Sequence, residues 1–378
     1  MYKNANLQQP EFNETMPKGG NTMEVDVNLQ YAGFEYHYVY IMFCGFIVWM
    51  IIPGIGLLYG GLARRKSAVA LLFQSLMVVA VTSFQWIFWG YSLAYSRTAG
   101  PFIGDLANFG MRNVMVAPSP GSSFLPEIVF CFYQLLFCAC TVQIVIGGAF
   151  ERGRIVPSLI FAFLWATIVY CPIACWTWNA NGWLFNLPSL DYAGGGPVHQ
   201  ASGWSALAYA FVLGKRKHAG DKSHVKPHNT TLVFLGTVFI WFGWFGFNGG
   251  STLNATVRAM LAAFNTNIAA STGMIGWVMV DFIKYRKFSV VGACEGAIAG
   301  LVGITPAAGY VSIWLAALIG FLTAVVCALC QNLNNWLHID EGMDVFKLHG
   351  VGGMVGSFLT GIFATEGSKY NLLSSALS

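Results

Sequence analysis

Two histidines lie in apolar segments and carry a similar motif. One reads His199-Gln-Ala-Ser-Gly203 and the other His349-Gly-Val-Gly-Gly353. A neutral imidazole offers one hydrogen-bond donor and one acceptor, so two rings in contact could share a proton and hand on a small polar solute. A single histidine of this kind could equally be a satisfied core residue. The repeated pattern with adjacent glycines favours a functional pair.

Asp191 precedes three glycines and Pro197 on the way into the segment of His199. A carboxylate at such a place can accept several backbone N–H bonds and fix the start of a helix. It could also bind a cation at an entrance. We favour the structural role, because the glycines supply donors so close by.

Four further side chains, Trp178, Phe137, Phe247 and Ser251, are expected near the outer ends of apolar segments. The face of a tryptophan attracts a small cation, by up to about 2 kcal/mol when water is excluded. The alternative is an aromatic belt at a membrane interface. With 13 tryptophans in the chain, composition alone favours the belt.

The composition shows where these residues must lie. Of 378 residues, 56% are hydrophobic and 10% are charged, against roughly 25% charged in soluble domains. Long segments such as 128–150, 155–190 and 296–339 carry no charge. Uncharged apolar stretches of about 20 residues are typical of transmembrane helices. The sequence excludes a cytosolic enzyme, a disordered chain and a partner that is a nucleic acid, and implies contact with membrane lipid.

The hydropathy pattern predicts an all-α polytopic membrane protein with ten spans. An extracellular segment (1–38) comes first. Two halves of five spans each follow, 39–214 and 230–365, and a basic cytosolic loop (215–229) separates them. Residues 366–378 form the C-terminal end. The expected spans are 39–62, 67–95, 128–150, 155–178, 198–214, 230–250, 259–280, 288–309, 311–333 and 348–365.

The basic residues predict the orientation. Most of the chain's 20 lysines and arginines fall in alternate loops, including 64–66, 215–226 and 284–287. Loops rich in Lys and Arg stay in the cytosol, so the N-terminus is expected outside. His199 and His349 then lie in the last spans of the two halves, which run in opposite directions. This arrangement predicts an inverted five-plus-five repeat with a site at the repeat interface.

No cofactor or metal is expected. The nine cysteines lie in apolar spans, so a disulfide framework is not predicted. Cys327 and Cys330 form a CxxC without a second ligand pair. His218, His224 and His228 fall in the basic loop, where a solvated role is expected.

Several motifs together resemble those of the ammonium transporter family (Amt/Mep/Rh), and they occur in family order over roughly residues 40–365. Phe84–Ser92 and Gly214–Arg216 look like the fungal branch, and His199 in place of an acidic residue resembles its high-affinity, nitrogen-sensing subtype. The matching motifs are Pro53-Gly-Ile-Gly-Leu-Leu-Tyr-Gly-Gly61, Gly148-Ala-Phe-Glu-Arg152, Asp191-Tyr-Ala-Gly-Gly-Gly196 with His199, Trp244-Phe-Gly-Phe-Asn-Gly-Gly-Ser251, Gly303-Ile-Thr-Pro-Ala-Ala-Gly309 and His349-Gly-Val-Gly-Gly353.

The resemblance implies an eleven-helix bundle that assembles as a homotrimer in the plasma membrane, with one pore per subunit. It implies net electrogenic uptake of ammonium, with methylammonium as an analogue, and passage as ammonia through a hydrophobic pore. The implied roles are an outer recruitment site (Trp178, Phe137 and Ser251, with Asp191 beside it), a phenyl gate (Phe137 and Phe247) and the pore histidines (His199 and His349).

The chain departs from the family pattern in three places. Only ten spans are expected before Ser378, so the family's eleventh helix is expected to be missing. An inactive truncated product is therefore one alternative to a working transporter. Glu295 stands in the eighth span where a small residue is expected, and Pro197 and Gln200 flank His199 unusually. A sensor that binds ammonium with little or no transport is a second alternative. An intramembrane enzyme that uses the histidines has no supporting nucleophile or metal motif.

Overall fold

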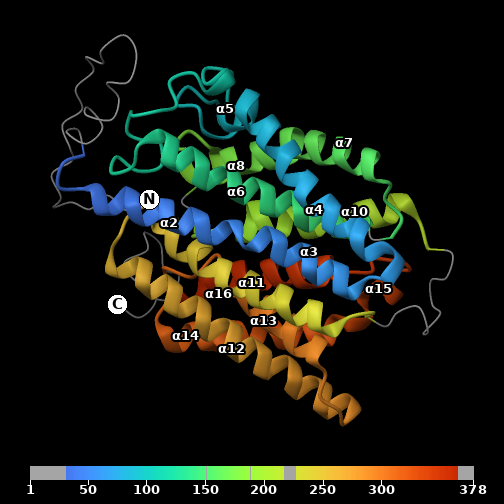
Figure 1. The fold of residues 1–378 in the computed structure, drawn as a ribbon. Coiled ribbons are helices and arrows are strands. Elements are labelled where there is room, and N and C mark those ends of the chain that lie inside the picture. The colour runs from blue at the N-terminus through green and yellow to red at the C-terminus, as the bar shows by residue number, and fades with distance from the viewer. Residues whose placement is uncertain (1–30, 150, 188, 217–226, 365–378) are drawn as a thin grey trace.

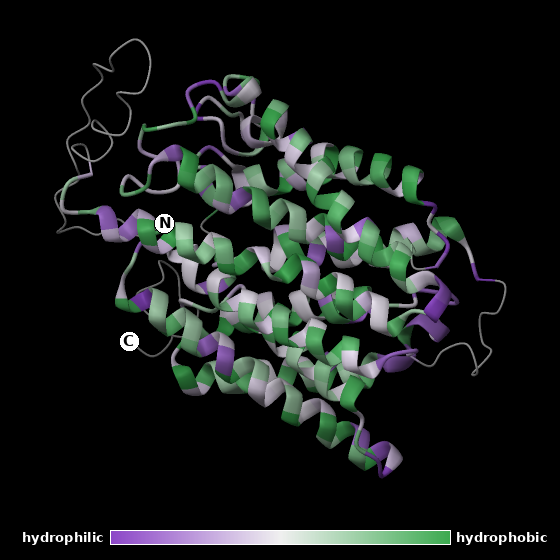
Figure 2. Ribbon diagram, in the orientation of Figure 1, coloured by the Kyte–Doolittle hydropathy of each residue, from purple (hydrophilic) through white to green (hydrophobic). Residues whose placement is uncertain are grey.

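The computed structural model describes residues 31–149, 151–187, 189–216 and 227–364, and within them the regular elements are helices. The helices run side by side as one elongated bundle (Figure 1). Hydrophilic residues gather toward the ends of the bundle and hydrophobic residues cover its length (Figure 2). The prediction of an all-α membrane protein is confirmed. Most of the segments 1–38 and 215–229, and all of the segment 366–378, lie outside the described residues.

The first half of the chain forms the upper part of the bundle in Figure 1. Short π-helical segments interrupt several of its helices, and one of them carries His199. The elements are α2 (Glu35–Trp49), α3 (Ile51–Leu62), α4 (Arg65–Gln85), η1 (Trp86–Gly90), α5 (Tyr91–Tyr95), η2 (Phe109–Met111), α6 (Glu127–Ile146), η3 (Gly147–Ala149), α7 (Ile155–Trp165), η4 (Ala166–Tyr170), α8 (Cys171–Trp178), α9 (Trp183–Asn186), η5 (Gly195–Gln200) and α10 (Ala201–Leu213).

The second half follows the same plan, and its last helix also begins as a π-helix. That π-helix carries His349. The elements are α11 (Thr230–Gly249), η7 (Gly250–Thr252), α12 (Val257–Tyr285), α13 (Val290–Ile304), α14 (Ile313–Leu329), η8 (Cys330–Asn332), α15 (Leu333–Trp336), η9 (Phe346–Val351) and α16 (Gly352–Phe363).

Each of the ten expected spans falls on helix, and six helices of the described residues are long and apolar enough to cross a membrane. The remaining four are shorter or more polar. For example, α13 has 15 residues, and α12 has 29 residues but includes buried Asn265 and Asp281. A helix that packs inside a bundle can carry polar residues, because neighbouring helices satisfy them.

Glycines let the helices pack closely, as the spacing of Gly292, Gly296 and Gly300 predicts. A Cβ on Gly296 would overlap Trp277, and one on Gly300 would overlap the backbone of Ala269. Close approach of backbones is the main source of helix association in lipid. The α12–α13 pair is therefore fixed by small residues rather than by large apolar ones.

Ion pairs join loops of both halves at one end of the bundle. Arg64 Nε lies 2.8 Å from Glu151 Oε2, and Arg216 Nη2 lies 2.7 Å from Asp340 Oδ1. Burial opposes ionisation of both carboxylates, but the hydrogen bonds from their arginines outweigh it and hold the pKa of Glu151 and of Asp340 below the ordinary values. The network therefore stabilises the folded chain in the ionised form.

Replacing Asp340 with Asn is expected to lower the melting temperature at neutral pH. Hydrogen bonds to charged groups contribute about 1.5–3 kcal/mol. Because the folded pKa of Asp340 lies below its ordinary value of 3.8, this stabilisation is present above pH 3.8 and is lost as the pH falls through the folded pKa. Melting curves in detergent should differ between wild type and variant at pH 7 and converge in strong acid. A constant difference at all pH values would contradict this assignment.

Candidate functional site

The two histidines meet in the middle of the bundle. His199 Nδ1 and His349 Nδ1 are 3.2 Å apart, and the ring centroids are 5.2 Å apart at an angle of 36°. The two residues are 0% and 7% exposed. For this hydrogen bond, one Nδ1 must carry the proton and the other must accept it; the bond is neutral when both rings are neutral and charge-assisted when the pair holds an extra proton. The buried Nε2 of His199 has no hydrogen-bond partner among the described residues, so one polar atom of the pair is left to meet a solute.

Glycines bring the two π-helices together. A Cβ on Gly203 would overlap the backbone of Gly350, and one on Gly353 would contact the Cβ of His199. Each histidine motif therefore supplies a glycine that lies against the other histidine's helix. The sequence pattern of a histidine followed by glycine four residues later has this steric reason.

An aromatic column leads from one side to the histidine pair. The rings of Phe137 and Phe247 stack with centroids 3.9 Å apart at 14°. Trp178 meets Phe137 edge-on at 6.1 Å, and Phe247 lies 6.3 Å from His199. Trp178 is partly exposed, whereas both phenylalanines are buried. The side chains thus form a continuous series from a partly open tryptophan to a buried pair of imidazoles.

Ser251 joins this column from α11 and η7. Its hydroxyl donates to the carbonyl of Phe247 at 2.8 Å and lies 3.4 Å from the hydroxyl of Tyr133. Tyr133 in turn bonds the Phe247 carbonyl at 2.8 Å. The structure thus brings Ser251 to the backbone of the phenyl pair, whereas the Nε1 of Trp178 donates to the carbonyl of Asp191 at 3.4 Å.

Asp191 uses both carboxylate oxygens on the backbone at the start of η5. It accepts N–H bonds from Gly194, Gly195 and Gly196 at 2.7–2.8 Å. Gly194 has a φ of +118°, which favours glycine. These contacts match the structural role favoured from the sequence, and they hold the helix that carries His199.

Three residues near the site were not selected from the sequence: Trp244, Tyr133 and Glu341. The ring of Trp244 stacks on His199 at 5.3 Å and 19°, and its Nε1 donates to the hydroxyl of Thr305 at 3.0 Å. Trp244 lies three residues before Phe247, and this helical spacing could have placed both on one face. Tyr133 has the same relation to Phe137, since the two are four residues apart.

Glu341 is the counterpart of Asp191 in the second half. It is buried, and its carboxylate accepts N–H bonds from Met343 at 3.0 Å and Phe346 at 3.3 Å, at the start of η9. Both histidines are thus carried by π-helices whose first turns bond a carboxylate. In each half a carboxylate lies eight residues before the histidine, and this shared spacing would have indicated Glu341.

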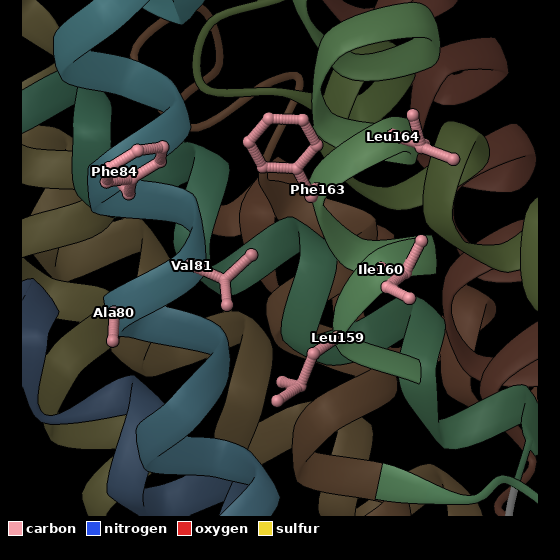
Figure 3. Close-up of a pocket in the computed structure, with 7 residues that line it drawn as sticks. All are labelled: Ala80, Val81, Phe84, Leu159, Ile160, Phe163 and Leu164. Carbon is pink, nitrogen blue, oxygen red and sulfur yellow. The ribbon is translucent and has the colours of Figure 1, made fainter. Parts of the chain in front are cut away.

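An apolar groove lies elsewhere, between α4 and α7. Figure 3 shows the side chains that line it, and they include none of the site residues: Ala80, Val81, Phe84, Leu159, Ile160, Phe163 and Leu164. A groove without polar groups offers nothing to orient a polar solute. His228 bonds the carbonyl of Ala63 at 2.9 Å, while His218 and His224 lie outside the described residues.

A helical bundle with a buried aromatic and histidine column defines a membrane transport protein. The chain belongs to the Ammonium Transporter Family, whose sequence model matches residues 39–377. It is 51% identical to Ammonium transporter 1 of Schizosaccharomyces pombe over 348 residues, which are 92% of this chain and 69% of that protein. It is 52% identical to Ammonium transporter MEP2 of Saccharomyces cerevisiae, over 92% of this chain and 70% of that protein.

Solved structures agree with these relatives. The crystal structure of Saccharomyces cerevisiae Mep2 has a TM-score of 0.86 and 52% identity, and the match covers 92% of this chain and 80% of that one. Candida albicans Mep2 has a TM-score of 0.87 and 47% identity, with 95% and 79% covered. The resemblance to the fungal branch is confirmed, and so is its transporter fold. The function is ammonium transport rather than enzymatic catalysis.

Proposed function

We propose that ammonium is recruited at Trp178, Phe137 and Ser251, with Asp191 beside them, loses its proton, and passes His199 and His349 as ammonia. Phe137 and Phe247 act as the gate. The observation that carries this mechanism is the direct contact of two buried imidazoles beneath a stacked phenyl pair. The gate rings stack with centroids 3.9 Å apart, which leaves no room for water between them, and the imidazoles beneath them supply the polar contacts.

Selection against potassium follows from this arrangement. Ammonium and potassium carry the same charge, but only ammonium has N–H donors and can lose a proton. Moving an unpaired ion into an apolar, water-excluding path costs many kcal/mol, whereas neutral ammonia carries no charge to bury. The Nε2 of His199, which has no hydrogen-bond partner among the described residues, gives ammonia a partner at the histidine pair.

Net charge moves because the proton travels as well. Ammonium gives its proton to an imidazole nitrogen of the pair, and ammonia continues along the column. The imidazolium passes the proton across the Nδ1–Nδ1 hydrogen bond, and ammonia takes it up again at the inner side. One positive charge then enters for each molecule, so uptake is electrogenic.

Uptake of radiolabelled methylammonium by yeast that lacks its own permeases tests this function. Saturable uptake is expected, and its absence at normal surface abundance would support the sensor alternative or an inactive product. A Sensor Amt Protein shares the fold at 26% identity and a TM-score of 0.85. The relatives near 50% identity are named transporters, so the sensor alternative is not favoured. We place the protein in the plasma membrane with its N-terminus outside, as a homotrimer.

Replacing Trp178 with Ala is expected to raise the half-saturation concentration for methylammonium. A desolvated cation–π contact contributes up to about 2 kcal/mol, which corresponds to roughly a tenfold to thirtyfold increase. Trp176 on the same helix donates to the carbonyl of Phe102 and has no contact with Phe137, so Trp176→Ala is the matched control. An unchanged half-saturation concentration in Trp178→Ala would rule out recruitment on this ring.

A further inference from the structure

A lysine lies buried in η9, directly before the tenth expected span (348–365) and next to the histidine pair. Lys347 is 4% exposed and stands in η9, two residues before His349. A charged side chain at such a place is costly and requires partners. Its Nζ lies 2.5 Å from Asp344 Oδ1 and donates to the carbonyl of Gln331 at 3.1 Å. Both groups belong to the second half of the chain.

The lysine and the histidine face opposite sides of their helix, because residues two apart in a helix point in nearly opposite directions. His349 meets His199, whereas Lys347 meets Gln331 in η8, directly after α14. The backbone adds a second tether on that side, since Cys327 Sγ donates to the Lys347 carbonyl at 3.2 Å. The pore histidine is therefore held from behind by a charged side chain.

Carboxylates surround this lysine in excess. Asp344 contacts it directly, and Glu295 on α13 and Glu341 lie within electrostatic range. Glu295 is partly exposed and also feels Asp344 and Asp281. Without Lys347, these carboxylates would repel one another in a poorly solvated place. The packing of α13 against η9 places Lys347 on the side of the bundle where Glu295 lies, so this lysine supplies a positive charge near the unexpected carboxylate.

The two halves fix their π-helices differently. Asp191 holds η5 with three hydrogen bonds, and Gln200 donates to Ser357 at 2.9 Å across the repeat interface. Glu341 holds η9 with two bonds, of which one is 3.3 Å long. The position that corresponds to Lys347 in the first half is Pro197, two residues before His199, and its side chain offers no tether. The carboxylate cap of η9 is thus weaker than that of η5, and η9 has in addition the ion pair between Lys347 and Asp344.

We propose that Lys347, charge-balanced by Asp344 and tethered to the carbonyl of Gln331, is a positioning residue that sets the place of His349 in the pore. The inference rests on the proposed role of His349. Lys347 does not touch the solute. It keeps η9 at the distance from η5 at which the two Nδ1 atoms share a hydrogen bond, so its loss changes selectivity as well as flux.

The test compares Lys347→Met, Glu295→Gln and the double variant in yeast that lacks its own permeases. Surface abundance is measured beside methylammonium uptake and potassium inhibition of that uptake. Lys347→Met is expected to reduce uptake per surface molecule roughly tenfold to a hundredfold, as a displaced reacting group does, and to increase inhibition by potassium. Glu295→Gln in the same chain should restore part of both, because it removes an uncompensated charge.

Lys284→Met is the matched control. Lys284 also donates to a backbone carbonyl, that of Ala328 in α14 at 3.4 Å, but it is exposed and far from the histidines in sequence. It should behave as wild type. If Lys347→Met lowers abundance alone and leaves uptake per molecule and potassium inhibition unchanged, the proposal is overturned.

A variant that fails to reach the surface is replaced by Lys347→Arg. This variant keeps the positive charge, but a guanidinium cannot reproduce the geometry in which a single Nζ contacts both Asp344 and the Gln331 carbonyl. We expect Lys347→Arg to reach the surface at normal abundance and to show lower uptake per molecule. If its uptake and its inhibition by potassium both equal those of the wild type, the proposal is overturned. Wild-type chain that takes up no methylammonium would instead overturn the proposed function, so the two failures are distinguishable.

Discussion

Replacing His199 or His349 with Ala is expected to abolish selective ammonium transport. Each change removes one partner of the 3.2 Å Nδ1–Nδ1 hydrogen bond and puts an apolar surface where a polar one was. Ammonia then loses its hydrogen-bond partner at the histidine pair, and the proton loses its path. We expect methylammonium uptake to fall at least about tenfold, or potassium to enter through the widened pore, because one charge-assisted hydrogen bond accounts for about 1.5–3 kcal/mol.

The double variant provides the stricter comparison. Residues that act as a unit show losses that are far from additive. His199→Ala combined with His349→Ala should therefore be no worse than the product of the single losses, and close to one of them. His37→Ala is a control, since this histidine bonds the backbone of Ala255 and lies outside the column. A single pore variant that transports and discriminates as wild type does would refute the paired mechanism.

Replacing Asp191 with Ala should have the second largest effect. Three backbone N–H groups at the start of η5 lose their acceptor, and each such bond contributes about 1.5–3 kcal/mol. The helix that carries His199 should shift or fray, and uptake should be lost with reduced surface abundance. Asp191→Asn should also fail, because an amide has one acceptor oxygen in place of two.

Asp105 offers the matched control for Asp191. It is an exposed carboxylate of an outer loop that accepts N–H from Ala107 at 3.0 Å. Asp105→Ala should leave uptake close to wild type. Normal abundance and normal uptake in Asp191→Ala would show that the backbone bonds of this carboxylate do not organise the pore.

The sequence was sufficient to predict the helical membrane fold and to select the residues that meet in the column. Charge-free runs mark the spans because lipid excludes charge, and the repeated histidine motif marks the ends of the two halves. The orientation of side chains was less accessible. Trp244 stacks on His199 and Glu341 caps η9 because of where whole helices lie, and that depends on close packing between distant glycines such as Gly203 and Gly350.

Glu295 illustrates a second limit. It stood out because a carboxylate is unexpected in that span, but its partner could not be named from spacing. Lys347 lies 52 positions further along the chain, in another helix, and the two are brought into range by the packing of α13 against η9. Electrostatic partners across helices follow from tertiary structure, whereas helical neighbours follow from sequence.

Currents from purified protein in lipid vesicles test the central claim most directly. A rapid rise in external ammonium should produce a transient inward positive current, because a proton accompanies each ammonia through the pore. An equal rise in potassium in the same vesicles should produce none, because the apolar column excludes an ion that cannot lose its charge. Comparable currents for both ions, or ammonium uptake without charge movement, would contradict transport through a histidine pair that separates ammonia from its proton.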